Sequence, residues 1–181
     1  DESATPFTGA AAMLAPDEVG EDLAKAGLVV LTSPSKTYNV AALDLAIAVI
    51  PDEKARRRFT AAGRDKAEVP PFGYAAALAI FEDSDGEVEM WRRRLVDYLR
   101  ANRDQVEQAL LSADLPDGRE LRLTRPEASY LTWVDVSSAL PKNPFLKLLN
   151  NGVAVTDGAP FGDRNAIRIN FGTQRKVLDE G

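Results

Sequence analysis

The sequence contains no cysteine and no histidine. Without cysteine, the chain has no disulfide bond and no thiol nucleophile. Without histidine as well, it lacks the usual ligands of transition metals, so a zinc site is not expected. Hydrolase mechanisms that pair histidine with serine or cysteine are excluded too, unless a partner chain supplies the base. Any acid–base chemistry therefore falls to lysine, carboxylate or tyrosine side chains.

A long apolar run and an excess of basic residues are also missing. No stretch approaches the length of a membrane span, and residues 1–6 lack the basic and apolar regions of a signal peptide, so we expect a cytoplasmic protein that binds no membrane. The net charge of −6 and the pI near 4.8 argue against a nucleic-acid partner, because phosphate binding needs clustered basic residues. The short basic run Arg56-Arg57-Arg58 is interpreted as a solvated helix face.

The first half of the chain alternates predicted helices and strands. A short helix is expected between Pro16 and Gly27. The runs Leu28–Leu31 and Leu45–Ile50 do not alternate with polar residues, which predicts strands inside a covered sheet. Proline and acidic residues then open a helix from Pro51 to Gly63, and a further helix is expected from Phe72 to Glu82.

A long amphipathic helix is predicted to begin the second half. Ser84 and Glu87 have the spacing of a capping box, and apolar residues follow at helical intervals to about Ala113. The remaining segments mix short strands with one helix: Glu120–Thr124, Ser129–Val136, Pro144–Asn150 (the helix), Val153–Thr156 and Ala166–Phe171. The sequence thus predicts an α/β protein with two domains, residues 1–85 and 86–181.

Lys36 lies between the first two predicted strands, in the run Thr32-Ser33-Pro34-Ser35-Lys36-Thr37-Tyr38-Asn39. Held there, it is expected to be partly stripped of water, which disfavours the ammonium form and makes the amine available to a carbonyl-bearing cofactor. Ser33 and Ser35 place hydroxyl groups beside it. The same run is also ordinary turn chemistry, in which a lysine simply faces solvent.

Arg168 is the second informative residue. Along the predicted strand Ala166–Phe171, Ile167, Ile169 and Phe171 share one face, and Arg168 lies on the other. A planar guanidinium on a face that lines a cleft is well suited to a two-point grip on a carboxylate. The alternative is a surface arginine on an outer strand face.

In order along the chain, these segments resemble the later half of pyridoxal-phosphate enzymes of the class I/II aminotransferase superfamily, fold type I, and within it the PatB/MalY branch of cystathionine β-lyases. The residues that carry the resemblance are Ser33-Pro34-Ser35-Lys36-Thr37-Tyr38-Asn39, Pro71-Phe72-Gly73-Tyr74, Tyr98-Leu99 with Asn102-Arg103-Asp104, Ala128–Asp135, Gly152–Val155 and Arg168-Ile169-Asn170-Phe171-Gly172. Six matches in register make the resemblance specific.

The resemblance implies roles for four residues. Lys36 matches the lysine that forms a Schiff base with pyridoxal 5′-phosphate and then carries the substrate's α-proton. Ser33 matches a hydroxyl that binds the cofactor phosphate, and Ser35 is placed with it at the cofactor. Arg168 matches the arginine that holds the substrate's α-carboxylate.

The resemblance also implies a fold, a reaction and partners. The fold is part of the large domain, a mostly parallel sheet covered by helices, followed by a smaller C-terminal α/β domain. The reaction is a carbon–sulfur β-lyase reaction of the cystathionine β-lyase type on a small-molecule amino-acid substrate, which releases a thiol, pyruvate and ammonia. The alternative is transamination, because both reactions use every residue named here. The fragment alone is expected to be inactive. A homodimer is implied as well. A hypothesis of another class is a catalytically silent fragment that serves as an interaction module.

Two departures from the family pattern stand out. Many class I enzymes carry a phosphate-binding arginine eight residues after the lysine, where this chain has Asp44. In the family, the aromatic that stacks on the cofactor ring, the glycine-rich phosphate loop and the aspartate paired with the pyridine nitrogen all precede the lysine segment. We therefore expect this chain to be the C-terminal half of a longer enzyme.

Overall fold

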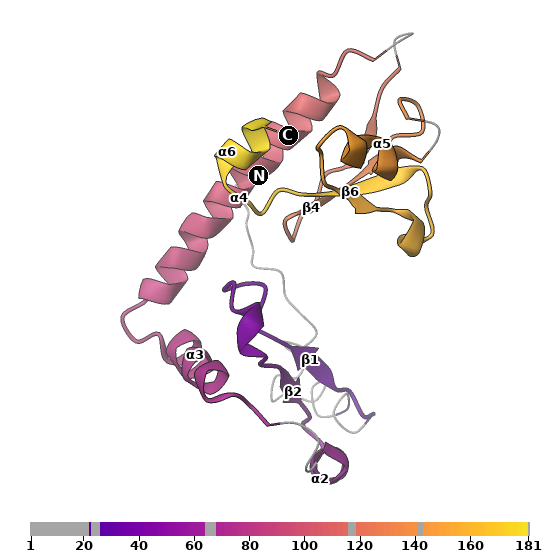
Figure 1. Ribbon diagram of the computed structural model, residues 1–181. Helices are drawn as coiled ribbons and strands as arrows, with labels where there is room; N and C mark the ends of the chain where they lie inside the picture. Colours follow the sequence, from indigo (N-terminus) through magenta and orange to yellow (C-terminus); the bar gives the residue numbers. More distant parts are fainter. Residues whose placement is uncertain (1–21, 23–25, 64–67, 116–118, 141–142, 181) are drawn as a thin grey trace. The chain divides into compact units, whose positions relative to one another are not determined.

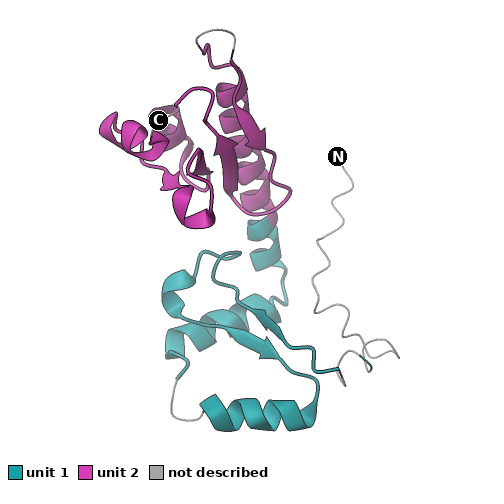
Figure 2. Ribbon diagram, turned by 90° about the vertical axis from the view of Figure 1, so that its right-hand side faces the viewer, with its two compact units in different colours: residues 1–92 teal, residues 93–181 magenta. Residues whose placement is uncertain are grey.

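The computed structural model describes residues 22, 26–63, 68–115, 119–140 and 143–180. The chain forms two compact units, Asp1–Arg92 and Arg93–Gly181 (Figure 2), and each is described here by itself. The division falls within helix α4 (Glu87–Leu111) and so seven residues beyond the predicted boundary after residue 85. The short helix predicted between Pro16 and Gly27 falls, apart from Asp22 and the last two residues, outside the described residues.

The first unit contains a two-stranded sheet and helices (Figure 1). Its elements are β1 (Val30–Thr32), the 3-10 helix η2 (Ala41–Leu43), β2 (Ile47–Val49), α2 (Glu53–Gly63) and α3 (Pro71–Glu82), followed by the start of α4. The two strands pair antiparallel, with Val30 opposite Val49. Both predicted strands and both predicted helices are therefore present.

The sheet of the first unit is more exposed than its sequence predicts. Leu31 is 71% exposed and Val29 41%, so the expectation that both strands lie inside a covered sheet is wrong for the described residues. The pairing of these two strands is antiparallel. The mostly parallel sheet that the resemblance implies is that of the complete large domain, of which the chain holds a part. Each strand has a single strand neighbour among the described residues, and the residues of β2 are partly buried whereas Leu31 and Thr32 of β1 are exposed.

The starts of α2 and α4 show how acidic residues begin helices in this chain. At α2, the Asp52 carboxylate accepts a hydrogen bond of 2.7 Å from the Ala55 N–H. At α4, Asp83 accepts from the N–H groups of Val88 at 3.0 Å and Glu89 at 2.9 Å. The predicted capping box at Ser84 is therefore wrong, because the carboxylate of the preceding residue takes the free N–H groups of the first turn.

The basic run on α2 is explained within that helix. Arg56 donates to the backbone carbonyls of Ile50 at 2.7 Å and Pro51 at 3.0 Å, and Arg57 pairs with Glu53 at 2.5 Å. Arg56, Arg57 and Arg58 are all exposed, as the solvated-face interpretation predicts.

Gly73 is the point at which α3 packs against η2. It is buried, and a Cβ atom added there would lie 2.3 Å from the backbone oxygen of Leu43. Alanine normally favours a helix over glycine, but here the contact with backbone must be relieved. We expect Gly73→Ala to lower the free energy of unfolding by about 1–3 kcal/mol in urea denaturation. Gly63→Ala is the control, because a Cβ at Gly63 meets nothing within 4 Å. Equal stability of the two variants would contradict the packing described.

The second unit packs a four-stranded antiparallel sheet against α4. Its further elements are β3 (Arg122–Thr124), β4 (Leu131–Asp135), α5 (Pro144–Asn150), β5 (Thr156–Asp157), the 3-10 helix η4 (Ala159–Phe161), β6 (Ala166–Asn170) and α6 (Arg175–Glu180), and the strand order is β3-β4-β6-β5. Val134, Val136 and Ile167 form the buried core, against which Leu110 of α4 and Leu148 of α5 pack.

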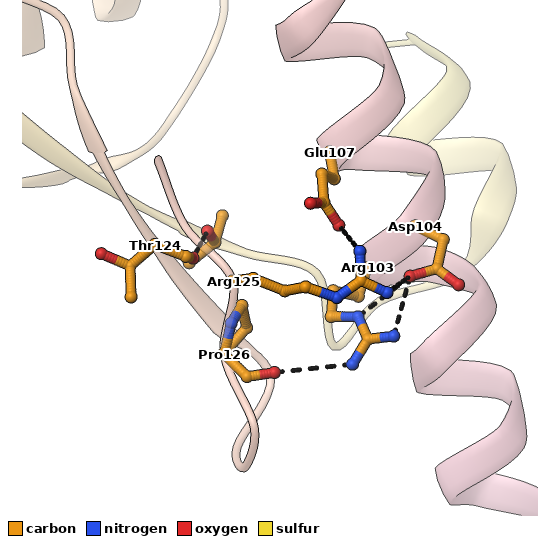
Figure 3. Close-up of polar contacts among 7 residues, drawn as sticks. Arg103, Asp104, Glu107, Thr124, Arg125 and Pro126 are labelled. Atoms are coloured by element: carbon orange, nitrogen blue, oxygen red, sulfur yellow. Dashed lines mark hydrogen bonds and ion pairs between the residues drawn. The ribbon is translucent and has the colours of Figure 1, made fainter. Parts of the chain in front are cut away.

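The segment that joins β3 to β4 is held to α4 by charged side chains (Figure 3). Arg125 pairs with Glu107 and, at 3.0 Å, with Asp104. Arg103 also contacts Asp104, at 2.8 Å, and reaches the backbone carbonyl of Pro126 at 3.5 Å. These contacts fix the sheet edge against the helix, although exposed ion pairs stabilise a fold only weakly.

No helix among the described residues is long and apolar enough to cross a membrane. In the same part of the chain, no group of acidic side chains is arranged to hold a metal ion.

Candidate active site

Lys36 lies on a compact turn between β1 and η2. Two backbone hydrogen bonds of 3.0 Å close the turn, from Tyr38 N–H to the Pro34 carbonyl and from Val40 N–H to the Ser35 carbonyl. Asn39 ends it with a φ of 56°, a conformation that asparagine tolerates better than most residues. The chain therefore carries Lys36 at the tip of a fixed backbone loop.

The Lys36 side chain is exposed, and it has no hydrogen bond or ion pair with any described residue. The expectation that the amine is partly stripped of water is therefore wrong for the described structure. The apolar strands on either side do not cover it. What the structure does provide is an amine without a competing partner at a defined position.

Ser33 and Ser35 lie together at the base of this turn, but their hydroxyl groups differ in availability. The Ser33 hydroxyl donates to the Leu45 carbonyl at 2.6 Å and accepts from the Ser35 N–H at 3.1 Å. A hydroxyl has one hydrogen to donate, and in Ser33 this hydrogen bonds the turn to the segment before β2. No described residue forms a hydrogen bond with the Ser35 hydroxyl, so that group is free to donate.

Tyr38 fixes the far end of the turn. Its ring stacks on that of Trp91, with centroids 6.4 Å apart and planes 20° apart. Together with Val40, Val88 and small residues of α3, these rings line a shallow apolar groove. Asp44, which replaces the arginine of many class I enzymes, is exposed and adopts a left-handed conformation with φ 46° at the end of η2.

Arg168 lies on β6, the strand between β4 and β5. Its neighbours across the sheet are Trp133 and Thr156, which share its face. Ile167 and Ile169 belong to the core on the opposite face, as the alternation predicts. Arg168 is half-buried, and its Nε atom is fully buried without a hydrogen-bond partner among the described residues. The terminal N–H groups of the same guanidinium are not buried and form no hydrogen bond with a described residue, so this cation can bind a carboxylate at two points.

Two side chains have clearly shifted pKa values, and neither belongs to the Lys36 turn. Hydrogen bonding to Glu89 raises the pKa of Arg92, beyond its already high value. On the sheet face of Arg168, hydrogen bonds from the Ser137 side chain and backbone hold the pKa of Asp135 below its usual value. Asp135 therefore stays ionised at neutral pH, but Ser137 rather than Arg168 is its partner.

Phe161 is a residue that the sequence-based reasoning missed. Its ring covers the Arg168 guanidinium, with Cζ 4.7 Å from the ring centroid, and it meets the edge of Trp133 at 5.8 Å. The available signal was one large aromatic in the otherwise small and polar run Asp157-Gly158-Ala159-Pro160-Phe161-Gly162, shortly before the strand that carries Arg168.

Comparison with known proteins decides the family. The model of aminotransferase class I and II matches residues 5–181. The chain belongs to this family. The match includes both the Lys36 turn and the strand that carries Arg168, which lie in different units.

Relatives within the aminotransferase family include carbon–sulfur lyases. Cystathionine beta-lyase PatB of Bacillus subtilis is 29% identical over 84% of this chain and 39% of its own length. The crystal structure of OvoB is 35% identical, with a TM-score of 0.77 over 90% of this chain and 40% of that one. A pyridoxal-phosphate-bound C–S lyase from Staphylococcus hominis is 26% identical, with a TM-score of 0.69 over 84% of this chain and 36% of that one.

These relatives confirm the resemblance to the PatB/MalY branch and the α/β fold type I. The chain spans about two fifths of the length of the curated relatives it matches. The roles of individual residues stay predictions. The structure brings Lys36, Ser33 and Ser35 together in one turn of the first unit, and it places Arg168 in the second unit.

Proposed function

We propose that the protein acts on amino acids with pyridoxal 5′-phosphate, as a carbon–sulfur β-lyase of the cystathionine β-lyase type. The observation that carries the proposal is the Lys36 turn, where an amine without a described partner stands beside two serine hydroxyl groups in a chain of the aminotransferase family. The names of PatB and of the Staphylococcus hominis enzyme support the lyase reaction. Lys36 is the proposed catalytic residue.

The residues present fit the cofactor unequally. The free amine of Lys36 fits its aldehyde, and the free Ser35 hydroxyl fits a phosphate oxygen, which only accepts hydrogen bonds. Ser33 can donate to phosphate only if it releases the Leu45 carbonyl. Asp44 brings a negative charge to a position where many relatives carry a positive one. We therefore assign the phosphate contact in this chain to Ser35 first and to Ser33 second.

Pyridoxal phosphate, when bound, supplies an electron sink for the negative charge left at Cα. The Lys36 amine takes the α-proton at Nζ, which needs the neutral amine. Arg168 holds the substrate carboxylate and so fixes the Cα–H bond toward the base. In a β-lyase, the electron pair then expels a thiolate from Cβ, and water converts the remaining three-carbon fragment to pyruvate and ammonia.

The same residues serve an aminotransferase, which is the second candidate. It is favoured by the family itself and by a 2-aminoadipate transaminase of Thermus thermophilus that is 28% identical over 99 residues. In that reaction no bond to Cβ breaks, and the proton returns without loss of a thiolate. A third candidate, a catalytically silent interaction module, is favoured by the exposed apolar side chains of β1 and α3.

The proposal includes a cytoplasmic location and a homodimer. The support for a dimer is the surface of α3, on which Phe72, Tyr74 and Phe81 are 60–78% exposed although the helix is apolar on all sides. A helix of that composition is normally buried.

A product assay tests the proposed function. The chain alone is expected to be inactive, so the assay uses the whole protein. With pyridoxal phosphate and L-cystathionine, we expect it to form pyruvate, detected through the oxidation of NADH by lactate dehydrogenase. Exchange of an amino group between an amino acid and a 2-oxo acid, without pyruvate from cystathionine, would select the aminotransferase instead. A folded whole protein that binds pyridoxal phosphate and gives neither product would contradict both enzymatic candidates.

A further inference from the structure

The environment of Arg168 contains more than the arginine itself. Trp133 and Thr156 flank it on neighbouring strands, and all three lie on the sheet face opposite the core. The Phe161 ring lies over the guanidinium at 4.7 Å, and its plane meets Trp133 at 85°. Two aromatic rings and one cation therefore form a continuous contact on this face.

Phe161 is held over Arg168 by the backbone of η4. The Gly158 N–H donates to the Ala166 carbonyl of β6 at 3.0 Å, and the Phe161 N–H donates to the Gly158 carbonyl at 2.9 Å. A Cβ atom at Gly158 would lie 2.4 Å from the Ala166 carbonyl oxygen, so the close approach requires glycine. The Asp157 carboxylate accepts from the Ala159 N–H at 3.0 Å. The segment is thereby fixed to the strand that carries Arg168.

The orientation of the guanidinium matters because its Nε–H lacks a partner. A long arginine side chain loses much rotamer freedom when it is fixed, and an aromatic ring against one face of the plane removes part of that freedom in advance. The terminal N–H groups of the guanidinium are not buried and form no hydrogen bond with a described residue, so they stay available for a carboxylate.

We propose that Phe161, backed by Trp133, is a positioning residue that holds the Arg168 guanidinium in the orientation that binds the α-carboxylate of the substrate. The inference rests on the proposed function in one respect, the assignment of Arg168 to that carboxylate. It adds a residue that makes no hydrogen bond to the substrate and acts through Arg168 alone.

Nuclear magnetic resonance of arginine Nε–H groups tests the inference without catalysis. The 15N-labelled chain is titrated with sodium acetate as the carboxylate probe and with sodium chloride at equal ionic strength. The Arg168 signal is identified by its absence in Arg168→Lys. We expect acetate, and not chloride, to shift this signal. Phe161→Leu should raise the acetate concentration at half-saturation about two- to fivefold, the effect of one cation–π contact, and Phe161→Tyr should restore it.

The chain offers a matched control in Tyr98, whose ring lies under the Arg175 guanidinium at 4.9 Å in the same unit. Tyr98→Leu should leave the acetate response of Arg168 unchanged. If Phe161→Leu loses its dispersed amide spectrum, Phe161→Met takes its place. An acetate response in the leucine and methionine variants equal to that of the parent chain would overturn the inference and leave the proposed function intact.

The remaining outcomes separate the two proposals further. An Arg168 signal that does not respond to acetate in the parent chain would overturn the inference together with the role of Arg168. A normal acetate series, together with a whole protein that forms neither pyruvate nor exchanged amino acid, would support the inference and count against the proposed function.

Discussion

Replacing Lys36 with alanine is expected to abolish the visible absorbance that pyridoxal phosphate develops with the parent chain. The absorbance requires a covalent link between the cofactor aldehyde and an amine, and Lys36 is an exposed amine on a closed turn with no described partner. Titration followed by visible spectroscopy measures the change. Borohydride reduction, followed by mass spectrometry of peptides, should place the modification on Lys36 in the parent chain.

The control for this variant is Lys54→Ala. Lys54 is also an exposed lysine of the first unit, on α2 rather than on the turn. The Lys54→Ala variant should keep the full absorbance, because an ordinary surface lysine reacts with pyridoxal phosphate only weakly and without saturation. A band that survives in Lys36→Ala, or a reduced adduct spread over several lysines, would show that Lys36 is not the attachment site.

The turn geometry adds a test of how the cofactor phosphate is held. Ser35→Ala removes the hydroxyl that no described residue engages, whereas Ser33→Ala removes the bond to the Leu45 carbonyl at 2.6 Å. Weaker pyridoxal-phosphate binding with unchanged stability is expected for Ser35→Ala. Ser33→Ala should also lower stability, by about 0.5–1.5 kcal/mol in urea denaturation. Identical behaviour of the two variants would contradict the difference between the hydroxyl groups.

Local patterns predicted the elements of this fold well. The apolar spacing of α4 and the alternation of Ile167, Arg168 and Ile169 each gave the right structure, because helix and strand periodicity depend on neighbours in sequence. The position of Lys36 on a turn between two strands followed from Ser, Pro and Asn in one short run.

What could not be predicted depends on contacts between distant residues. Ser33 engages a carbonyl twelve residues away, and Phe161 reaches Arg168 through a turn whose course no periodicity describes. The exposure of Lys36 and Leu31 likewise depends on which distant residues pack over them, and the local sequence does not determine that. Strand β5 begins three residues later than predicted, at Thr156, after the glycine turn at Gly152 has ended α5.

The largest effect on stability is expected at Asn102, the fully buried polar side chain of α4. Its Nδ2 group donates to the carbonyls of Phe171 at 3.0 Å and Thr173 at 2.8 Å, and its Oδ1 accepts from Arg175 at 3.3 Å. These bonds join the helix to the segment between β6 and α6. Asn102→Leu keeps the volume but leaves the two carbonyls unpaired, so we expect the free energy of unfolding to fall by about 2–4 kcal/mol.

A matched control lies one helical turn away at Gln105, whose side chain donates to Asp179 of α6 at 2.6 Å through a solvent-exposed hydrogen bond. Gln105→Leu should cost no more than about 0.5 kcal/mol, because water replaces the lost partner. Urea denaturation of both variants measures the difference. A similar loss of unfolding free energy in Asn102→Leu and Gln105→Leu would mean that burial does not strengthen the hydrogen bonds of Asn102.

Asn102→Asp separates hydrogen bonding from packing, because it keeps the shape of the side chain. An ionised aspartate cannot donate to the Phe171 and Thr173 carbonyls, and both burial and these carbonyl oxygens disfavour its charge, whereas the Arg175 guanidinium at 3.3 Å favours it. We expect the first two effects to outweigh the third, so that its pKa in the folded variant lies above the unfolded value of about 3.9. The loss of stability in the variant is then smallest below the unfolded pKa, where the protonated carboxyl can still donate to one carbonyl. Its deficit relative to the parent chain should grow as the pH rises through the folded pKa. If the loss of stability does not change with pH, it arises from packing, and the hydrogen-bonding role assigned to Asn102 is wrong.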